Sequence, residues 1–157
     1  MVRFLKLKQN KMKTFLEKVL LATNGQIEFV NITEKIEETL EKSGIKNGQV
    51  LVFSPHTTAA IVINHEEPML LKDITRMLYR LAPIDDRYDH DLFEITKNNL
   101  SDGRSNGHSH CKNVLLNRSE TLIVQKGKVI LGPKQDVFFV ELDGGRKRDF
   151  LIQITGE

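Results

Sequence analysis

The segment from Asp102 to Asn113 concentrates residue types that can do chemistry, because it reads DGRSNGHSHCKN. It holds two of the five histidines, the single cysteine and two glycines, and it has no large apolar side chain. In an extended segment His108 and His110 would project from the same face and could reach one metal ion. Surface His pairs also arise by chance, so a metal site and an ordinary solvated pair both remain open. Cys111 would point away from His110 and is interpreted as a small buried side chain.

Two further histidines have polar neighbours. His56 lies in SPHTTAA, among hydroxyl groups, and His90 lies in YDHD, between two carboxylates. A metal-bound imidazole needs an acceptor for its second ring nitrogen, and Asp89 and Asp91 are close enough in sequence to supply one. Each histidine could equally be a solvated or hydrogen-bonded structural residue.

A basic turn occurs near the C-terminus, in the sequence DGGRKRD at residues 143–149. If this segment continues as a strand, Arg146 and Arg148 share a face, and two guanidinium groups suit a phosphate or a carboxylate. The alternative is a solvated turn in which the arginines pair with Asp143 and Asp149.

Two segments have the apolar periodicity of helices. Residues 32–44 carry apolar side chains four positions apart, with Thr33 placed to cap the start and Gly44 to end the helix. Residues 68–81 carry a longer apolar stripe, and Pro68 suits the first turn.

Short apolar runs with turn residues between them predict six or seven strands. They are expected at residues 15–23, 26–32, 48–55, 59–64, 121–131 (a hairpin), 136–145 and 149–157. Strands and two main helices in this mixed order predict an α+β fold with a largely antiparallel sheet. The polar stretch at residues 83–113 has little periodicity and is interpreted as a long functional loop.

Composition excludes several classes of protein. The chain has 157 residues, 28% charged and 39% hydrophobic, with a net charge of +2, which fits one globular domain. With no tryptophan, two tyrosines and no extended basic stripe, it lacks the stacking platform of a nucleic-acid-binding protein. No apolar run approaches the ~20 residues that span a bilayer, so no membrane partner is expected.

The sequence also suggests a compartment and a domain boundary. The N-terminus has a basic flank but no apolar run of signal-peptide length. One cysteine cannot form an internal disulfide, so the fold does not depend on an oxidising compartment. We therefore expect a cytoplasmic protein with an N-terminal arm at residues 1–12, where Met12 offers a second start, and a single domain at residues 13–157.

The motifs occur in a characteristic order: SPHTTAAIVIN, LLKDI, Y…HD, DG…HSHCKNVLL, KGKVILG and FFVELDGGRKR. In this order they resemble the YjbQ family over residues 13–157, and members of that family are described as secondary thiamine-phosphate synthases. The resemblance implies a compact, mostly antiparallel β-sandwich with two main helices that assembles as a homotrimer. It also implies a polar, histidine-bearing site near the subunit contacts.

The resemblance assigns roles to individual residues. The implied metal ligands are His56, His90 and His110, with His108 ranked below them. The implied substrate contacts are Thr57, Thr58, Asn64, Gln135 and Glu141. The implied catalytic residues are Asp102, Lys112, Arg146 and Arg148. Asn117, Lys134 and Gly145 depart from the family pattern, but none of these departures touches the three matched histidines.

The implied reaction joins an aminopyrimidine diphosphate to a thiazole phosphate and releases pyrophosphate. A divalent ion such as Mg²⁺ beside Lys112, Arg146 and Arg148 would neutralise the departing diphosphate. Three imidazoles favour a Zn²⁺-like ion, however, which supports a second hypothesis, metal-assisted hydrolysis of a small phosphorylated or carbonyl compound with Asp102 as base. A third hypothesis is a trimeric protein that binds a small anion without turnover.

Overall fold

The computed structural model describes residues 11–96 and 105–157, so most of the predicted N-terminal arm lies outside the described residues. The described residues form eight strands and four helices. In chain order these are β1 (Lys13–Ala22), β2 (Glu28–Asn31), α1 (Thr33–Ser43), β3 (Gly48–Phe53), β4 (Ala59–Asn64), α2 (Pro68–Leu81), α3 (Asp89–Thr96), α4 (Gly107–Val114), β5 (Ser119–Gln125), β6 (Lys128–Val129), β7 (Asp136–Glu141) and β8 (Lys147–Gly156).

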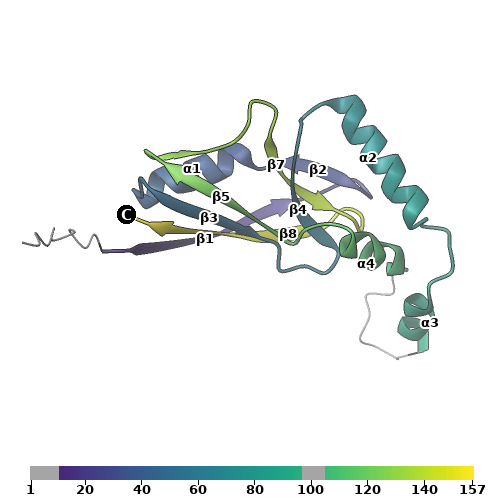
Figure 1. Ribbon diagram of the computed structural model, residues 1–157. Helices are drawn as coiled ribbons and strands as arrows, with labels where there is room; N and C mark the ends of the chain where they lie inside the picture. The colour runs from purple at the N-terminus through teal and green to yellow at the C-terminus, as the bar shows by residue number, and fades with distance from the viewer. Residues whose placement is uncertain (1–10, 97–104) are drawn as a thin grey trace, which may run out of the picture.

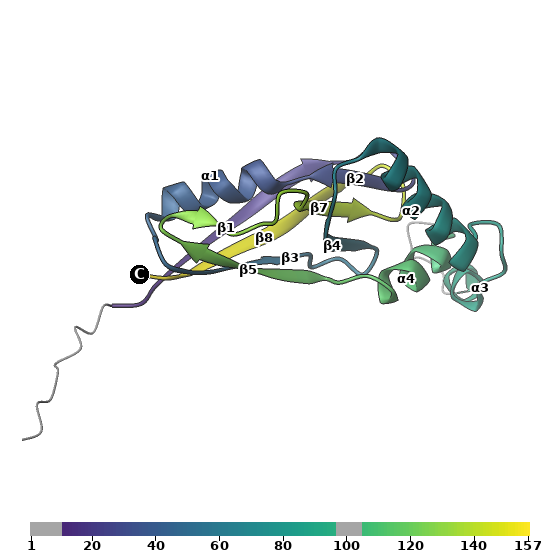
Figure 2. The ribbon, with the colours of Figure 1, turned by 45° about the horizontal axis from the view of Figure 1, so that its top comes forward.

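Two antiparallel sheets make up the body of the protein (Figures 1 and 2). The larger sheet has the strand order β1-β8-β3-β5-β6 and curls into a half-barrel, and the smaller sheet has the order β2-β7-β4. The predicted α+β class with antiparallel sheets is therefore confirmed.

The main core lies between the two sheets because their strands alternate. On β8 the side chains of Arg148, Phe150, Ile152 and Ile154 face inward and are buried, whereas the residues between them face outward. Phe139 of β7 meets Phe150 across this core, with ring centroids 6.0 Å apart. Helix α1 contributes further side chains to the same core, including Ile36 and Leu40.

Helix α2 packs against the other face of the smaller sheet at one end of the molecule (Figure 1). Its Leu78 is fully buried against Phe138 and Val140 of β7. The first turn contains Pro68, as predicted, and the side chain of Glu67 caps the helix by accepting hydrogen bonds from the backbone N–H groups of Met69 and Leu70.

The prediction for α1 was correct at its C-terminal end and wrong at its N-terminal end. Gly44 ends the helix in the left-handed conformation, with φ of 67°. Thr33 does not cap the start: it is the first helical residue, and its hydroxyl accepts a hydrogen bond from the N–H of Val137 instead. The side chain of Asn31 takes over the capping contact, because its Oδ1 accepts the N–H of Thr33 at 2.9 Å.

The prediction of one long loop at residues 83–113 was wrong, because this stretch contains α3 and α4. Helix α4 has no continuous apolar stripe, so periodicity did not reveal it. Polar bonds dock it instead: the Ser109 hydroxyl donates to the carbonyl of Leu142, and the Asn113 amide donates to the carbonyl of Ala59 at 2.7 Å.

None of the helices that the structure describes is long and apolar enough to cross a membrane.

Candidate functional site

Helix α4 sends its two histidines in opposite directions. Residues two apart on a helix lie about 200° apart around its axis, so His108 is buried while His110 is half-buried. The segment is therefore not extended, and the two histidines do not share a face. Cys111, which was expected to be buried, is exposed because it too lies on the outward side of α4.

His110 instead pairs with His90 of α3. Their ring centroids are 4.8 Å apart, with an angle of 69° between the ring planes. Two imidazoles that bind one ion through bonds of ~2.0–2.1 Å have ring centres about 4.5–5.3 Å apart. The pair therefore has the spacing of two ligands of a single metal ion.

His56 lies elsewhere, against Asp149 of β8. Its Nε2 is 3.2 Å from the Asp149 carboxylate and 3.1 Å from the carbonyl of the same residue. Within the described residues, no three His, Cys, Asp or Glu side chains are placed to hold a metal ion together. A single chain thus does not assemble His56, His90 and His110 into one ligand set.

Asp91 fixes α3 to the start of α4. Its Oδ1 accepts the N–H groups of Asn106 at 3.0 Å and Gly107 at 2.8 Å, and its other oxygen accepts the hydroxyl of Ser105. Burial would raise the pKa of Asp91, but these hydrogen bonds outweigh it and lower that pKa. The helix N-terminus, which is an obvious place for a phosphate, is therefore filled by the protein's own carboxylate.

Lys112 is fully buried, with no exposed surface. Its Nζ lies 3.0 Å from Nδ1 of His108 and 5.4 Å from the centre of the Tyr79 ring. Burial lowers the pKa of Lys112, and burial together with the nearby Lys112 lowers the pKa of His108. Lys112 forms no ion pair with a carboxylate in the part of the chain that the structure describes, so the two bases make an internal pair behind the exposed face of α4.

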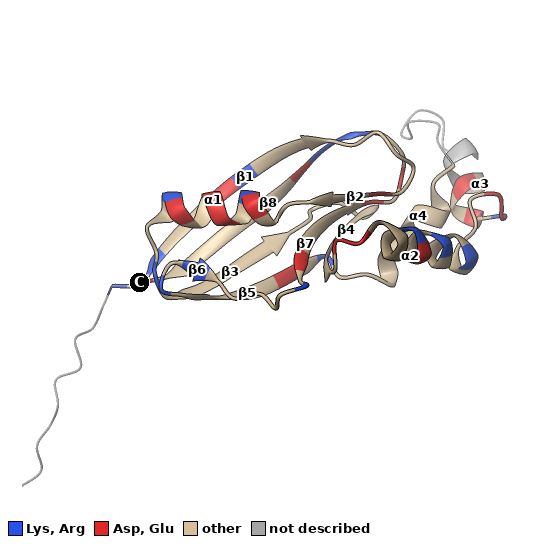
Figure 3. Ribbon diagram, turned by 90° about the horizontal axis from the view of Figure 1, so that it is seen from above, with Lys and Arg blue, Asp and Glu red and all other residues tan. Residues whose placement is uncertain are grey.

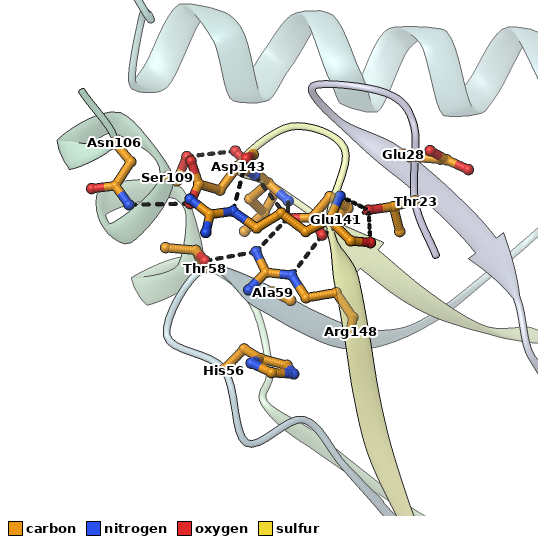
Figure 4. A network of polar contacts seen from close by, with 12 residues as sticks. Thr23, Glu28, His56, Thr58, Ala59, Asn106, Ser109, Glu141, Asp143 and Arg148 are labelled. Atoms are coloured by element: carbon orange, nitrogen blue, oxygen red, sulfur yellow. Dashed lines mark hydrogen bonds and ion pairs between the residues drawn. The ribbon is translucent and has the colours of Figure 1, made fainter. Parts of the chain in front are cut away.

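Arg148 and Glu141 form a buried ion pair that joins the two sheets (Figure 4). Nε and Nη2 of Arg148 donate to the two oxygens of Glu141 at 2.7 and 2.6 Å, and Nη2 also donates to the hydroxyl of Thr58 at 2.9 Å. Burial would raise the pKa of Glu141, but the hydrogen bond from Arg148 and those from the Asp143 N–H and the Thr23 hydroxyl lower it. Both charges are satisfied inside the protein, which favours a structural role for this pair.

Arg146 lies closer to the surface and beside α4. Its Nη2 is 2.6 Å from Oδ2 of Asp143, and the same oxygen accepts the side-chain amide of Asn106 at 3.1 Å. The β7–β8 turn is thereby tied to the start of α4 (Figure 4). This is the pairing with Asp143 that the sequence left as an alternative to ligand binding.

The other implied residues are dispersed. Thr57 is exposed beside His56, and Thr58 is buried. Asn64 is at the end of β4 that pairs with Asp136, whereas Glu141 pairs with Ala59 at the other end, about 17 Å away along the strand. Gln135 precedes Asp136 and so lies near Asn64, at the end of β4 away from Glu141. Its side chain accepts the N–H of Gly132 within the same turn. Asp102 lies outside the described residues.

Sequence reasoning missed the residues that hold the site together. They are Asn106 and Ser109, together with the capping role of Asp91 and the hydrogen bond from Asn106 to Asp143. Their partners lie 15 to 37 residues away, so local spacing carried no signal for them. The family motif DG…HSHCKN contained Asn106 and Ser109, and it was the one sequence feature that pointed to this region.

The chain thus defines an α+β protein with two antiparallel sheets and a polar site between short helices. The family model described as "UPF0047 protein YjbQ-like" matches residues 17–157, and the chain belongs to this family.

Similar proteins cover nearly the whole chain. A UPF0047 protein of Methanothermobacter thermautotrophicus is 38% identical over 93% of this chain and 95% of its own length. The UPF0047 protein YugU of Bacillus subtilis is 32% identical over 90% of this chain and 99% of its own. A crystal structure from Sulfolobus solfataricus, described as a protein of unknown function, is 35% identical and has a TM-score of 0.84 over 94% of this chain and all of that one. These relatives establish the fold and the family but name no reaction.

Proposed function

We propose that the protein is an enzyme that acts on a small phosphorylated metabolite where α3, α4 and the β7–β8 turn meet. The observation that carries this proposal is the pairing of His90 and His110. Two imidazoles from separate helices meet at the spacing of two metal ligands, with His90 exposed and His110 half-buried. Arg146 lies near the start of α4 and offers a guanidinium group to a phosphate.

The reaction that the family resemblance supports is the condensation of an aminopyrimidine diphosphate with a thiazole phosphate, with release of pyrophosphate. In the free protein Arg146 is paired with Asp143, so a bound phosphate would compete with that carboxylate for the guanidinium. Arg148 and Glu141 would keep the two sheets in register at this end of the molecule rather than contact substrate. Lys112 and His108 would support α4 from within and so hold His110 in place.

The residues present fit part of a metal site. His90 and His110 would supply two nitrogen ligands, which suits a Zn²⁺-like ion, and a further ligand would come from another subunit. When bound, such an ion would polarise a phosphoryl oxygen or activate a water molecule.

The test combines elemental metal analysis with a pyrophosphate-release assay on the two thiamine precursors. We expect His90→Ala and His110→Ala each to lose bound metal and to lower kcat/KM by about 10²-fold or more. His65→Ala, a half-buried histidine on the β4–α2 link, is the matched control and should change neither. Full activity in His110→Ala would contradict the proposal.

One observation favours hydrolysis as a second candidate reaction. Condensation must neutralise a departing diphosphate, but the cations Arg148 and Lys112 are both buried inside the protein. A monophosphate ester needs less positive charge, and Arg146 with the two histidines could serve it. Metal-dependent hydrolysis of p-nitrophenyl phosphate that is lost in His110→Ala, without any condensation, would select this reaction. Saturable phosphate binding with no turnover of either substrate would instead indicate a binding protein.

We also propose a homotrimer, supported by the outward face of the larger sheet. This open face carries the exposed apolar side chains Leu16, Leu20, Phe53 and Ile123. Large exposed apolar side chains that share one face are typical of contacts between proteins. Asp149 lies on the same face and holds His56 and Lys18, at 3.2 and 3.1 Å. A second subunit on this face would therefore lie against His56.

A further inference from the structure

A groove runs between α2 and β2, away from the histidine site. Its volume is about 550 Å³, which lies in the range of ~300–1,000 Å³ typical of small-molecule sites. The apolar side chains of Ile27, Phe29 and Leu71 line it, and each is half-buried. The groove exists because β2 is an edge strand, whereas α2 packs its buried Leu78 over β7 and leaves the side chains of β2 partly uncovered.

Two carboxylates at the edge of the groove are already engaged. Oε2 of Glu28 accepts the N–H groups of Asn24 and Gly25 at 2.6 and 2.7 Å. Oε2 of Glu66 accepts the side-chain amide of Asn31 at 2.8 Å. One oxygen of each carboxylate therefore faces a donor of the protein itself, and both groups keep their negative charge.

The cations of the groove are available by comparison. Lys72 is exposed and makes no ion pair with any residue that the structure describes. Among the described residues Arg76 pairs with Asp73 of the same helix alone, at 3.2 Å, and both side chains are 69% exposed, so that pair contributes little. Figure 3 shows basic residues along α2. The groove thus combines an apolar floor with positive charge on one side.

From this combination we propose that the groove between α2 and β2 binds a small organic anion with an apolar body, in the class of aromatic or branched-chain carboxylates. The apolar part lies on Ile27, Phe29 and Leu71, and the anionic group lies at Lys72. The site is independent of the proposed reaction, because it uses none of the residues placed there.

Two dyes that share one apolar body test the proposal on the full chain. 8-Anilinonaphthalene-1-sulfonate carries the negative charge, and N-phenyl-1-naphthylamine lacks it. Lys72→Glu should weaken binding of the sulfonate about fivefold or more, because a charge reversal acts at short range across partly exposed surface, and it should change binding of the neutral dye by less than about twofold. Thr75→Phe, which fills the groove from α2, should weaken both dyes.

Arg80→Glu is the matched control, since it makes the same charge change on an exposed residue of α2 that does not line the groove. Backbone amide shifts in a ¹⁵N NMR titration should locate the sulfonate at residues 27–29 and 71–79. Three results would overturn the proposal: an equal loss in Arg80→Glu, no loss in Lys72→Glu, or shifts confined to the open face around Leu16 and Leu20. Absence of dye binding to the native protein would overturn it as well.

Discussion

Individual charged residues of the site differ in how their charge is balanced. Arg148 and Glu141 neutralise each other within the protein, and Lys112 is buried beside another base. Arg146 is partly exposed and shares Asp143 with the start of α4. The buried charged residues therefore stabilise the fold, whereas a ligand can reach Arg146. The stability of the buried ion pair can be tested by substitution.

Arg148→Met should lower the free energy of unfolding by about 3–5 kcal/mol, because it leaves the Glu141 carboxylate buried without its cation. The double variant Arg148→Met/Glu141→Leu should recover most of that loss, since it removes both charges. Urea denaturation at neutral pH measures the difference. Arg76→Met, which removes an exposed ion pair, should cost less than ~1 kcal/mol. A double variant no more stable than the single one would contradict this interpretation.

Acid should destabilise the protein partly through Glu141. Its pKa in the folded state is below the ordinary value of 4.5, so the unfolded chain takes up a proton first as the pH falls. The stabilisation from the ionised carboxylate is fully present above pH 4.5 and is lost as the pH falls from there through the folded-state pKa. Urea unfolding between pH 6 and 3 should show a shallower decline in Glu141→Gln than in the native protein, although the variant is less stable at pH 6.

Among the elements, those with apolar periodicity were predictable and those docked by polar bonds were not. Most strands and the helices α1 and α2 bury one apolar face each. Their apolar residues therefore recur with the spacing of a strand or of a helix. Helices α3 and α4 are held by Asp91, Ser109 and Asn113, whose partners are distant in sequence. For the same reason the residue types of the site could be predicted, but the pairing of His90 with His110 could not.

Gly107 is the position where α4 approaches closest to the segment before α3. A Cβ atom there would lie 2.5 Å from Cβ of Tyr88. Gly107→Ala should therefore cost about 1–3 kcal/mol of stability and increase hydrogen exchange in α3, because α3 must move away from α4.

Gly132→Ala is the control for that change, since the new Cβ would meet only the end of the flexible Gln135 side chain, at 3.2 Å. A fall in Tm and faster exchange of α3 amides in Gly107→Ala alone would support the close packing. Equal effects of the two substitutions would show that α3 is not held against Gly107.

The whole molecule has two different faces. Helix α2 covers the outside of the smaller sheet, whereas the open face of the larger sheet carries Leu20, which is 77% exposed. Strongly exposed apolar side chains gathered on one face of a sheet are typical of a subunit contact. We therefore expect the proposed subunit contact on the open face, on the opposite side of the molecule from the α2–β2 groove.

Leu20→Glu should convert the proposed trimer into monomers, because it places a charge within the buried part of the interface. Sedimentation velocity at micromolar concentration measures the change, and circular dichroism should show that the variant stays folded. Leu81→Glu is the matched control, since Leu81 is 59% exposed at the end of α2 and away from this face. A native protein that sediments as a monomer would contradict the trimer, as would equal dissociation in the control.

Strand β8 lies between β1 and β3 and pairs with both, yet it is the last element of the sequence. Every residue of β1 from Lys13 to Ala22 has its partner on β8. At ~5–20 residues per second, a ribosome would make β8 roughly 6–25 s after β1. During that interval β1 has no strand to pair with, and its apolar side chains are open to the chaperones that meet a nascent chain. Strand β1 can therefore join the larger sheet only after β8 has been made, whereas β3, β5 and β6 can pair with one another earlier.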